Sequence, residues 1–186
     1  MILTISHSTK PVKGSISLPG DKSIAQRAII LASIAEGKSI LRNVPLSDDC
    51  LSMIRCVRQL GVEVKVRLPR PAGTRNDKKV KGTGVVTIQG RGLYGLKNPS
   101  TPPHQWNWCG GKPLNVGESG TAARLLTGLL VGQRFPSVIT GKKTLLSRPM
   151  KRVIEPLCLM GAKIKSKEGR LPIRIYPATL KGIKYT

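Results

Sequence analysis

Aromatic and acidic residues are scarce in this chain. Only 3% of its 186 residues are aromatic, so a core built from its 39% hydrophobic residues has to be aliphatic. Asp and Glu number 9 against 32 Lys and Arg, which gives a formal net charge of +23. Such a charge favours anionic partners: phosphorylated metabolites, nucleic acid or anionic membranes. A solvated basic surface, or an acidic remainder of a longer protein, explains the charge as well.

Metal ligands and long apolar segments are also lacking. The four cysteines show no C-x-x-C spacing and the chain has two histidines, so we expect no zinc site. No signal peptide opens the chain, and no apolar run reaches the roughly 18 residues that a membrane helix needs. Asn98-Pro99-Ser100 has proline in the middle, which excludes it as a glycosylation site. These absences favour a cytoplasmic protein in a reducing compartment.

What the chain does contain is one pattern written twice, at offsets of 97 to 100 residues. Each copy has the order strand, helix, strand, helix, strand, and closes on a strand-like run, at 85–89 and at 171–176. The matched residues are Gly20 and Gly117, Ser47 and Ser147, and Gly61 and Gly161. An internal repeat of this length is typical of a duplicated unit, and its order predicts α/β layering.

The first helix of each copy follows a glycine-bearing turn. In the first copy Asp21 or Ser23 can cap a helix that runs through Ala35 and stops at Gly37. This helix is apolar nearly all round, so we expect it to be buried. The corresponding helix of the second copy is expected at about 121–131.

The second helix of each copy is predicted after Ser47 and after Ser147. Asp48 and Asp49 lie in the first turn after Ser47, where the helix dipole favours carboxylates. We expect at least one of the two to be purely a capping residue, and the other is a candidate ligand contact. Pro149 is expected near the first helical position of the later helix. Segments 68–84 and 98–113 are predicted to be loops.

The first turn combines two cations with a hydroxyl at a helix start. Backbone amides at such a start attract anions, and Lys22, Ser23 and Arg27 add two full charges and a donor. The alternative is a capped helix with two solvated cations. Gln26 and Arg27 interrupt an otherwise apolar helix, which favours an anion-binding site instead.

The second turn repeats the design. Gly120 lets a ligand approach the backbone, Ser119 and Thr121 offer hydroxyls, and Arg124 follows one turn later. Arg148, near another helix start, is a further cation suited to bidentate recognition of phosphate or carboxylate. A surface arginine is the alternative for Arg148. Because the two turns occupy equivalent places in the repeat, one cleft could use both.

These turns and the segments around them resemble the EPSP synthase family of enolpyruvyl transferases. The family joins phosphoenolpyruvate to shikimate 3-phosphate in the shikimate pathway of aromatic amino-acid biosynthesis. The likeness runs from about 16 to 177, with four motifs in family order. They are Leu18-Pro19-Gly20-Asp21-Lys22-Ser23 with Arg27; Ser47-Asp48-Asp49; Gly117-x-Ser119-Gly120-Thr121 with Arg124; and Arg148-Pro149-Met150 followed by Glu155-Pro156-Leu157 and Met160-Gly161-Ala162.

The resemblance implies an inside-out α/β fold made of βαβαββ units, three in each of two domains. On that basis this chain holds an N-terminal strand segment at 1–15, a first unit at 16–97 and a second unit at 98–186 with an inserted loop at 98–113. The third unit and the second domain are expected to be absent, so the chain is an N-terminal part with an incomplete first domain. The full-length enzyme is expected to be a monomer, and this part alone is expected to be inactive.

The resemblance also implies roles for the residues of both turns. Lys22 contacts both substrates, and Ser23 and Arg27 hold shikimate 3-phosphate. Gly120 borders phosphoenolpyruvate, and Arg148 contacts its phosphate. Thr121, Arg124 and Asp49 are supporting candidates. The family reaction is an addition–elimination that uses no metal or cofactor, and glyphosate is the expected inhibitor.

Glu118 departs from the family pattern, which usually has asparagine there. A carboxylate thus lies beside an expected anion pocket. It can turn away, pair with Arg124 or Arg148, or weaken phosphoenolpyruvate binding, and the sequence leaves these options open.

Two other functions fit the sequence. A basic nucleic-acid-binding protein would explain the net charge of +23, but such proteins usually place aromatic residues among their cations for stacking, and Phe135 is the only phenylalanine here. Nucleic acid is therefore expected to bind only non-specifically. A non-catalytic, truncated remnant of the enzyme is the other alternative.

Overall fold

The computed structural model describes residues 18–68, 82–97 and 112–185. The N-terminal segment 1–15 and most of the two predicted loops, at 68–84 and 98–113, lie outside these residues. No helix in the described part of the chain is long and apolar enough to cross a membrane.

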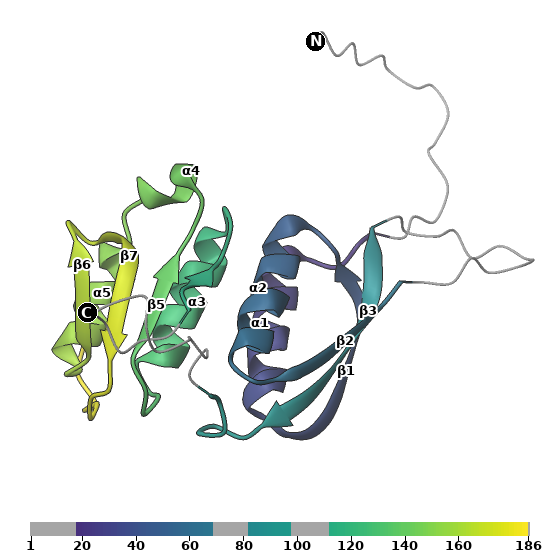
Figure 1. The fold of residues 1–186 in the computed structure, drawn as a ribbon, viewed down its shortest axis with the longest axis horizontal. Helices are drawn as coiled ribbons and strands as arrows, with labels where there is room; N and C mark the ends of the chain where they lie inside the picture. Colours follow the sequence, from purple (N-terminus) through teal and green to yellow (C-terminus); the bar gives the residue numbers. More distant parts are fainter. Residues whose placement is uncertain (1–17, 69–81, 98–111, 186) are drawn as a thin grey trace, which may run out of the picture.

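The first unit is a three-stranded sheet with two helices on one face (Figure 1). Its elements are α1 (Lys22–Ile34), β1 (Glu36–Pro45), α2 (Asp48–Gln59), β2 (Glu63–Arg67) and β3 (Thr83–Arg91). The strand order is β1-β3-β2, and β3 runs antiparallel to both neighbours. β1 and β2 are therefore parallel to each other, and α2 is the crossover between them. Val86 and Ile88 of β3 are fully buried and face the helices.

The second unit repeats this arrangement with one additional strand. Its elements are β4 (Leu114–Asn115), α3 (Gly120–Leu130), β5 (Ser137–Thr140), α4 (Lys143–Leu146), α5 (Lys151–Leu159), β6 (Lys163–Lys167) and β7 (Arg170–Tyr176). The strand order is β4-β5-β7-β6, with β7 antiparallel to β5 and β6 and with β4 parallel to β5. Apart from the short α4, this unit has the expected βαβαββ order, so the predicted α/β repeat is confirmed.

The repeat extends to the hydrogen bonds that end two helices. After α2, the N–H of Val62 donates to the Val57 carbonyl and the N–H of Gly61 donates to the Arg58 carbonyl. After α5, Ala162 and Gly161 make the corresponding pair of bonds, to Leu157 and Cys158. Gly61 and Gly161 have φ of 84° and 97°, the left-handed conformation that this helix ending requires and that glycine adopts without strain. Both matched glycines are therefore explained by the left-handed conformation that each helix end requires.

The two cation-bearing helices also start alike. Asp21 is the N-cap of α1, and its side chain accepts a bond of 2.7 Å from the N–H of Ile24. Ser119 is the N-cap of α3, and its hydroxyl accepts a bond of 3.1 Å from the N–H of Ala122. Of the two caps that the sequence allowed for α1, Asp21 rather than Ser23 is therefore the one formed.

Three helices, α1, α2 and α3, lie between the two sheets. In Figure 1, α1 and α2 cover one face of the first sheet, and α3 lies beside them against β5 of the second sheet. The largest fully buried side chains in the described ranges are all Ile, Leu or Met. The expectation of an aliphatic core is confirmed, and this core fixes the two helix starts relative to each other.

The expectation that α1 is buried all round is wrong. Ile24 and Leu31 are 60% and 63% exposed, because β1, β3, α2 and α3 cover only part of the helix surface. Leu31 lines an apolar groove of about 440 Å³ between α1 and α3, together with Leu125 and Leu129. The apolar residues around α1 thus predict more packing contacts than the described residues make with this helix.

The expected start of the later helix is also wrong by a few residues. Ser147 follows α4 as its C-cap, and Met150 is the N-cap of α5, so Pro149 precedes the helix instead of opening it. The Ser147 hydroxyl donates to the Thr144 carbonyl. The reason for the difference is α4, a single turn that has no counterpart between β1 and α2, where every residue is described.

Candidate anion-binding site

At the start of α1, Lys22 is held by an ion pair. Its Nζ lies 3.2 Å from Asp49 Oδ2, with the side chains 60% and 28% exposed. Asp49 is in the first turn of α2, so this pair joins the starts of two helices. Of the two carboxylates considered there, Asp49 is therefore the one that contacts a candidate site residue.

Ser23 and Arg27 lie on the same helix as Lys22 but face different surroundings. Ser23 is half-buried, and Arg27 is exposed one turn further on. Arg27 lies at the apolar groove between α1 and α3. Within the part of the chain that the structure describes, its guanidinium makes no ion pair. It therefore remains available for an anion.

At the start of α3, two guanidinium groups meet over a glycine. A Cβ placed on Gly120 would lie 2.8 Å from Arg124 Nη1 and 3.8 Å from Arg148 Nη1. Arg124 Nη2 also donates to the Pro149 carbonyl at 3.4 Å, which ties the loop before α5 to α3. Thr121, the next residue of α3, is half-buried.

This second cluster is suited to binding an anion. The first amides of α3 and the positive end of its dipole point to the same region as the two guanidinium groups. Arginine matches the geometry of phosphate and carboxylate groups through parallel N–H donors. Because Gly120 has no side chain, an anion can approach the backbone closely.

One buried hydrogen-bonded pair joins the two helix starts. Gln26 Nε2 donates to Ser119 Oγ at 3.2 Å, across 93 residues of sequence. Gln26 and Ser119 are 1% and 3% exposed. Since Ser119 is also the N-cap of α3, this link connects α1 directly to the start of α3. Buried polar pairs of this kind fix one arrangement, because breaking them leaves unsatisfied groups.

Glu118 has a partner that the sequence did not suggest. Its Oε1 lies 3.8 Å from Lys142 Nζ, and the two side chains are 55% and 59% exposed. The loop after β5 brings Lys142 there, because the N–H of Lys142 donates to the Gly117 carbonyl at 2.7 Å. A surface pair at this distance contributes little free energy, but it places a cation beside the carboxylate.

The described thiols close to this region are inert. Cys50 lies beneath Lys22, with its Sγ 3.8 Å from the Lys22 carbonyl oxygen, and burial raises the pKa of the Cys50 thiol. Burial also raises the pKa of Cys56 to about 12. Both therefore stay protonated at neutral pH and are not nucleophiles. No group of three His, Cys, Asp or Glu that could hold a metal ion occurs among the described residues.

Most of the predicted residues fall into two clusters, while Arg27 lies outside both, at the groove between α1 and α3. Lys22 and Asp49 form the first, beside Ser23, while Gly120, Arg124 and Arg148 form the second. The link between the clusters was not predicted. Its sequence signal is Gln26, which together with Arg27 interrupts the apolar residues of α1.

The fold and the two clusters define an α/β protein that gathers cationic side chains at the starts of its helices. A family profile described as EPSP synthase (3-phosphoshikimate 1-carboxyvinyltransferase) matches residues 6–75 and 98–186. The chain therefore belongs to the EPSP synthase family, and the predicted resemblance is confirmed.

Individual relatives agree with the family profile. The chain is 43% identical over 175 residues to the 3-phosphoshikimate 1-carboxyvinyltransferase of Thermoanaerobacter pseudethanolicus, covering 94% of this chain and 35% of the relative. It is 42% identical over 184 residues to the enzyme of the same name from Salinibacter ruber, covering 99% and 37%. The EPSP synthase structure from Acinetobacter baumannii matches with a TM-score of 0.73 and 37% identity, over 92% of this chain and 34% of that one. The chain thus spans about a third of the length of the relatives it matches.

Proposed function

We propose that this chain forms part of the active site of an enolpyruvyl transferase. The reaction moves the enolpyruvyl group of phosphoenolpyruvate to the 5-hydroxyl of shikimate 3-phosphate and releases phosphate. The observation that supports it most is the pair of guanidinium groups over Gly120, at a helix start joined by the Gln26–Ser119 link to a second cationic helix start. Two linked anion sites suit a reaction between two phosphorylated substrates.

In this proposal, shikimate 3-phosphate binds at the start of α1. Lys22 and Arg27 supply positive charge, and Ser23 supplies a hydroxyl donor. Asp49 holds the Lys22 ammonium near the start of α2, since the two lie 3.2 Å apart. The phosphate replaces this carboxylate or joins it as a partner of Lys22.

Phosphoenolpyruvate binds at the start of α3. Its phosphate lies against Arg148 and Arg124, and Gly120 leaves the space for it. Thr121 offers a hydroxyl from the same turn. Glyphosate, a phosphonate and carboxylate compound, competes for this pocket. The Glu118–Lys142 pair at the rim limits the repulsion that the carboxylate exerts on either anion.

The chemistry is an addition followed by an elimination. The 5-hydroxyl oxygen forms a bond to C2 of phosphoenolpyruvate, the hydroxyl loses its proton, and C3 gains one, which gives a tetrahedral ketal. C3 then loses a proton as the C2–O bond to phosphate breaks. Both steps need an acid and a base. The residues of this chain bind and orient the two anions, with the ammonium of Lys22 close to the charge of both.

A titration tests the assignment of shikimate 3-phosphate to the start of α1. Shikimate 3-phosphate is titrated into the chain by calorimetry, with Arg27→Ala as the variant and Lys167→Ala, an exposed cation of β6, as the control. Arg27→Ala should weaken binding about tenfold or more, because a hydrogen bond to a charged group is lost. The control should bind like the wild type. Equal affinity of all three proteins would place shikimate 3-phosphate elsewhere.

A turnover assay tests whether this chain contributes to catalysis. A polypeptide of these 186 residues is expected to release no phosphate from the two substrates, because it spans about a third of its relatives. Mixing it with a separately produced C-terminal part of a relative should restore some turnover, and Lys22→Ala should abolish that gain. Robust phosphate release by the chain alone that survives Lys22→Ala would contradict the assigned site. Substrate binding without restored turnover would indicate a non-catalytic remnant.

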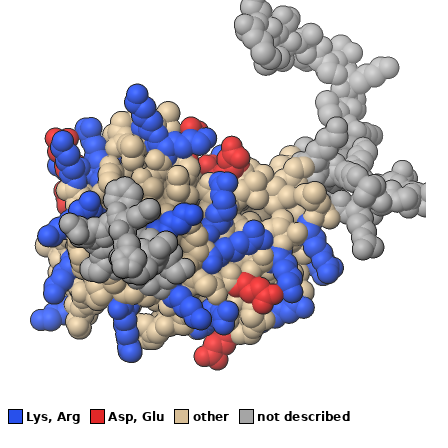
Figure 2. Space-filling model, in the orientation of Figure 1, with Lys and Arg blue, Asp and Glu red and all other residues tan. Residues whose placement is uncertain are grey.

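A second role, non-specific attraction to nucleic acid, is supported by the surface charge. Figure 2 shows Lys and Arg side chains spread over the visible face, with few acidic side chains among them. Binding of this kind should weaken steeply as salt is raised and should not depend on base sequence. Filter binding of two unrelated oligonucleotides at several salt concentrations measures both properties.

A further inference from the structure

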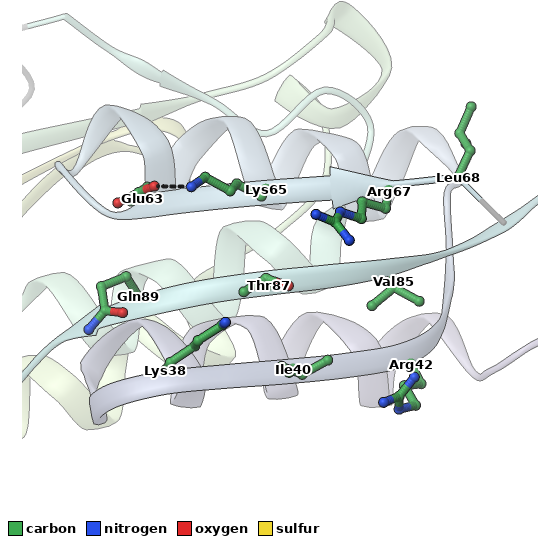
Figure 3. Close-up of a pocket in the computed structure, with 10 residues that line it drawn as sticks. All are labelled: Lys38, Ile40, Arg42, Glu63, Lys65, Arg67, Leu68, Val85, Thr87 and Gln89. Carbon is green, nitrogen blue, oxygen red and sulfur yellow. Dashed lines mark ion pairs between the residues drawn. The ribbon is translucent and has the colours of Figure 1, made fainter. Parts of the chain in front are cut away.

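The first sheet has a hollow on the face that points away from the helices. It measures about 1030 Å³ and is lined by alternate residues of β1, β2 and β3 (Figure 3). The intervening residues, such as Val86 and Ile88, are buried under the helices. Because successive side chains of a strand point to opposite faces, the lining residues form an outer surface that is independent of the site at the helix starts.

The walls of this hollow are cationic. Lys38 and Arg42 stand on β1, and Lys65 and Arg67 stand on β2, while β3 runs between them. At one end, Arg42 and Arg67 flank the neutral side chain of Val85 (Figure 3). The hollow is therefore a groove with an uncharged floor and positive walls.

One carboxylate makes the positive charge of the groove unequal at its two ends. Glu63 stands on β2 and bonds Lys65 at 2.9 Å (Figure 3). The hydrogen bond from Lys65 holds the pKa of Glu63 below its ordinary value, so the carboxylate stays ionised and offsets the charge of Lys65. Lys38, Arg42 and Arg67 make no ion pair with any residue in the described ranges. The uncompensated charge is thus greatest at the end that holds the two arginines.

We propose that this groove binds an extended, acidic segment of another polypeptide. Side chains on one face of a strand repeat every two residues, about 6.6 Å apart, and so do those of an extended peptide. Carboxylates at alternate positions of the peptide therefore match the row of Lys65 and the row of Arg42 and Arg67, whereas the row of Lys38 also holds Glu63. The two walls are two strand spacings apart, about 9.6 Å, which leaves room for one extended backbone along β3.

The lining favours a peptide over single-stranded nucleic acid. Nucleic-acid grooves usually combine cations with aromatic rings on which bases stack. Val85, Thr87 and Gln89 of β3 form the floor here, and none of the described residues that line the groove is aromatic. Arginine pairs with carboxylates in a bidentate manner, so Arg42 and Arg67 suit two acidic residues of the bound segment.

The test measures fluorescence anisotropy of a labelled eight-residue peptide in which Glu and Thr alternate. Two probes serve for comparison: a peptide of the same composition with its four Glu in one block, and an oligothymidylate of equal net charge. The protein variant is Arg42→Glu with Arg67→Glu. The matched control is Lys163→Glu with Lys167→Glu, which changes the total charge equally but on β6 of the second sheet.

The alternating peptide should bind more tightly than both comparison probes. The Arg42→Glu/Arg67→Glu protein should lose affinity at least about tenfold, because two charge-assisted contacts are replaced by repulsion. The β6 control should lose less than about twofold, since salt screens charges that lie beyond the Debye length. If urea unfolding shows that the double Glu variant is unfolded, Arg42→Gln with Arg67→Gln gives the decisive comparison.

Equal losses in the groove variant and the β6 control would overturn the proposal, because they would show attraction to net charge alone. Tighter binding of the blocked peptide, or of the oligothymidylate, would also overturn it. Anion binding at Gly120 should be unchanged in the groove variants, so failure here leaves the proposed enzymatic function untouched.

Discussion

Replacing Gly120 by alanine should separate ligand binding from folding. The new Cβ would lie 2.8 Å from Arg124 Nη1, closer than real Cβ contacts allow, and 3.7 Å from Leu145 Cδ1. The atom that has to move is the end of a flexible side chain, so the backbone can stay in place. The arginine moves out of the anion pocket, and the methyl group occupies part of the space left for the ligand.

The expected loss can be estimated from the contact that is broken. A hydrogen bond to a charged group contributes about 1.5–3 kcal/mol, and the lower end applies because the Arg124 side chain is only half-buried. Each 1.4 kcal/mol corresponds to about a tenfold change in affinity. Phosphoenolpyruvate and glyphosate should therefore bind about tenfold more weakly, while shikimate 3-phosphate, assigned to the α1 start, should be affected much less.

Gly128→Ala is the matched control for this substitution. It lies on the same helix, and a Cβ there meets nothing within 4 Å. Alanine favours a helix over glycine by up to about 1 kcal/mol, so Gly128→Ala should raise the free energy of unfolding without changing phosphoenolpyruvate binding. Calorimetric titration and urea unfolding of both variants give the comparison. An equal loss of both substrates in Gly120→Ala, together with reduced stability, would indicate a folding defect and refute the reasoning.

Three further outcomes are expected. In urea unfolding, a double-mutant cycle of Gln26→Leu and Ser119→Ala should give a coupling energy of about 1 kcal/mol, and a value near zero would mean that the two side chains do not interact. A thiol reagent at pH 8 should modify exposed Cys158 rapidly while the two cysteines of α2 stay protected, which Cys158→Ser checks. By NMR titration, the pKa of Glu63 should lie below its ordinary value and should return towards that value in Lys65→Ala. Because the folded-state pKa is lowered, the ion pair stabilises the fold at neutral pH, and this stabilisation is lost as the pH falls through that pKa.

The features that sequence predicted best are those with local causes. The repeat match of Gly61 with Gly161 reflects a left-handed glycine after a helix, and the α1 start depends on a cap at Asp21, so both are visible in a few neighbouring residues. The proximity of Arg124 and Arg148 was inferred only through the family resemblance. The Glu118–Lys142 pair depends on how the loop after β5 folds back.

Other features escaped prediction because they depend on what packs against an element. The apolar sequence of α1 is compatible with complete burial, but the described neighbours leave Ile24 and Leu31 largely exposed. The single turn α4 has no counterpart in the described segment between β1 and α2, so reasoning by repeat placed the start of α5 too early. Periodicity and internal symmetry identify elements, but they do not determine which faces are covered.

In the proposed function, an anion that replaces Asp49 at the α1 start binds Lys22 by exchange. An incoming anion competes with a carboxylate already 3.2 Å from the ammonium group, in a setting open enough for either partner to leave. Partly exposed pairs of this kind contribute up to about 1 kcal/mol, so the competition lowers affinity by at most about fivefold. Chloride and other monovalent anions offer Lys22 little that Asp49 does not already provide. A dianionic phosphate offers more charge and more acceptor oxygens, so the proposed site is expected to discriminate among anions by their charge.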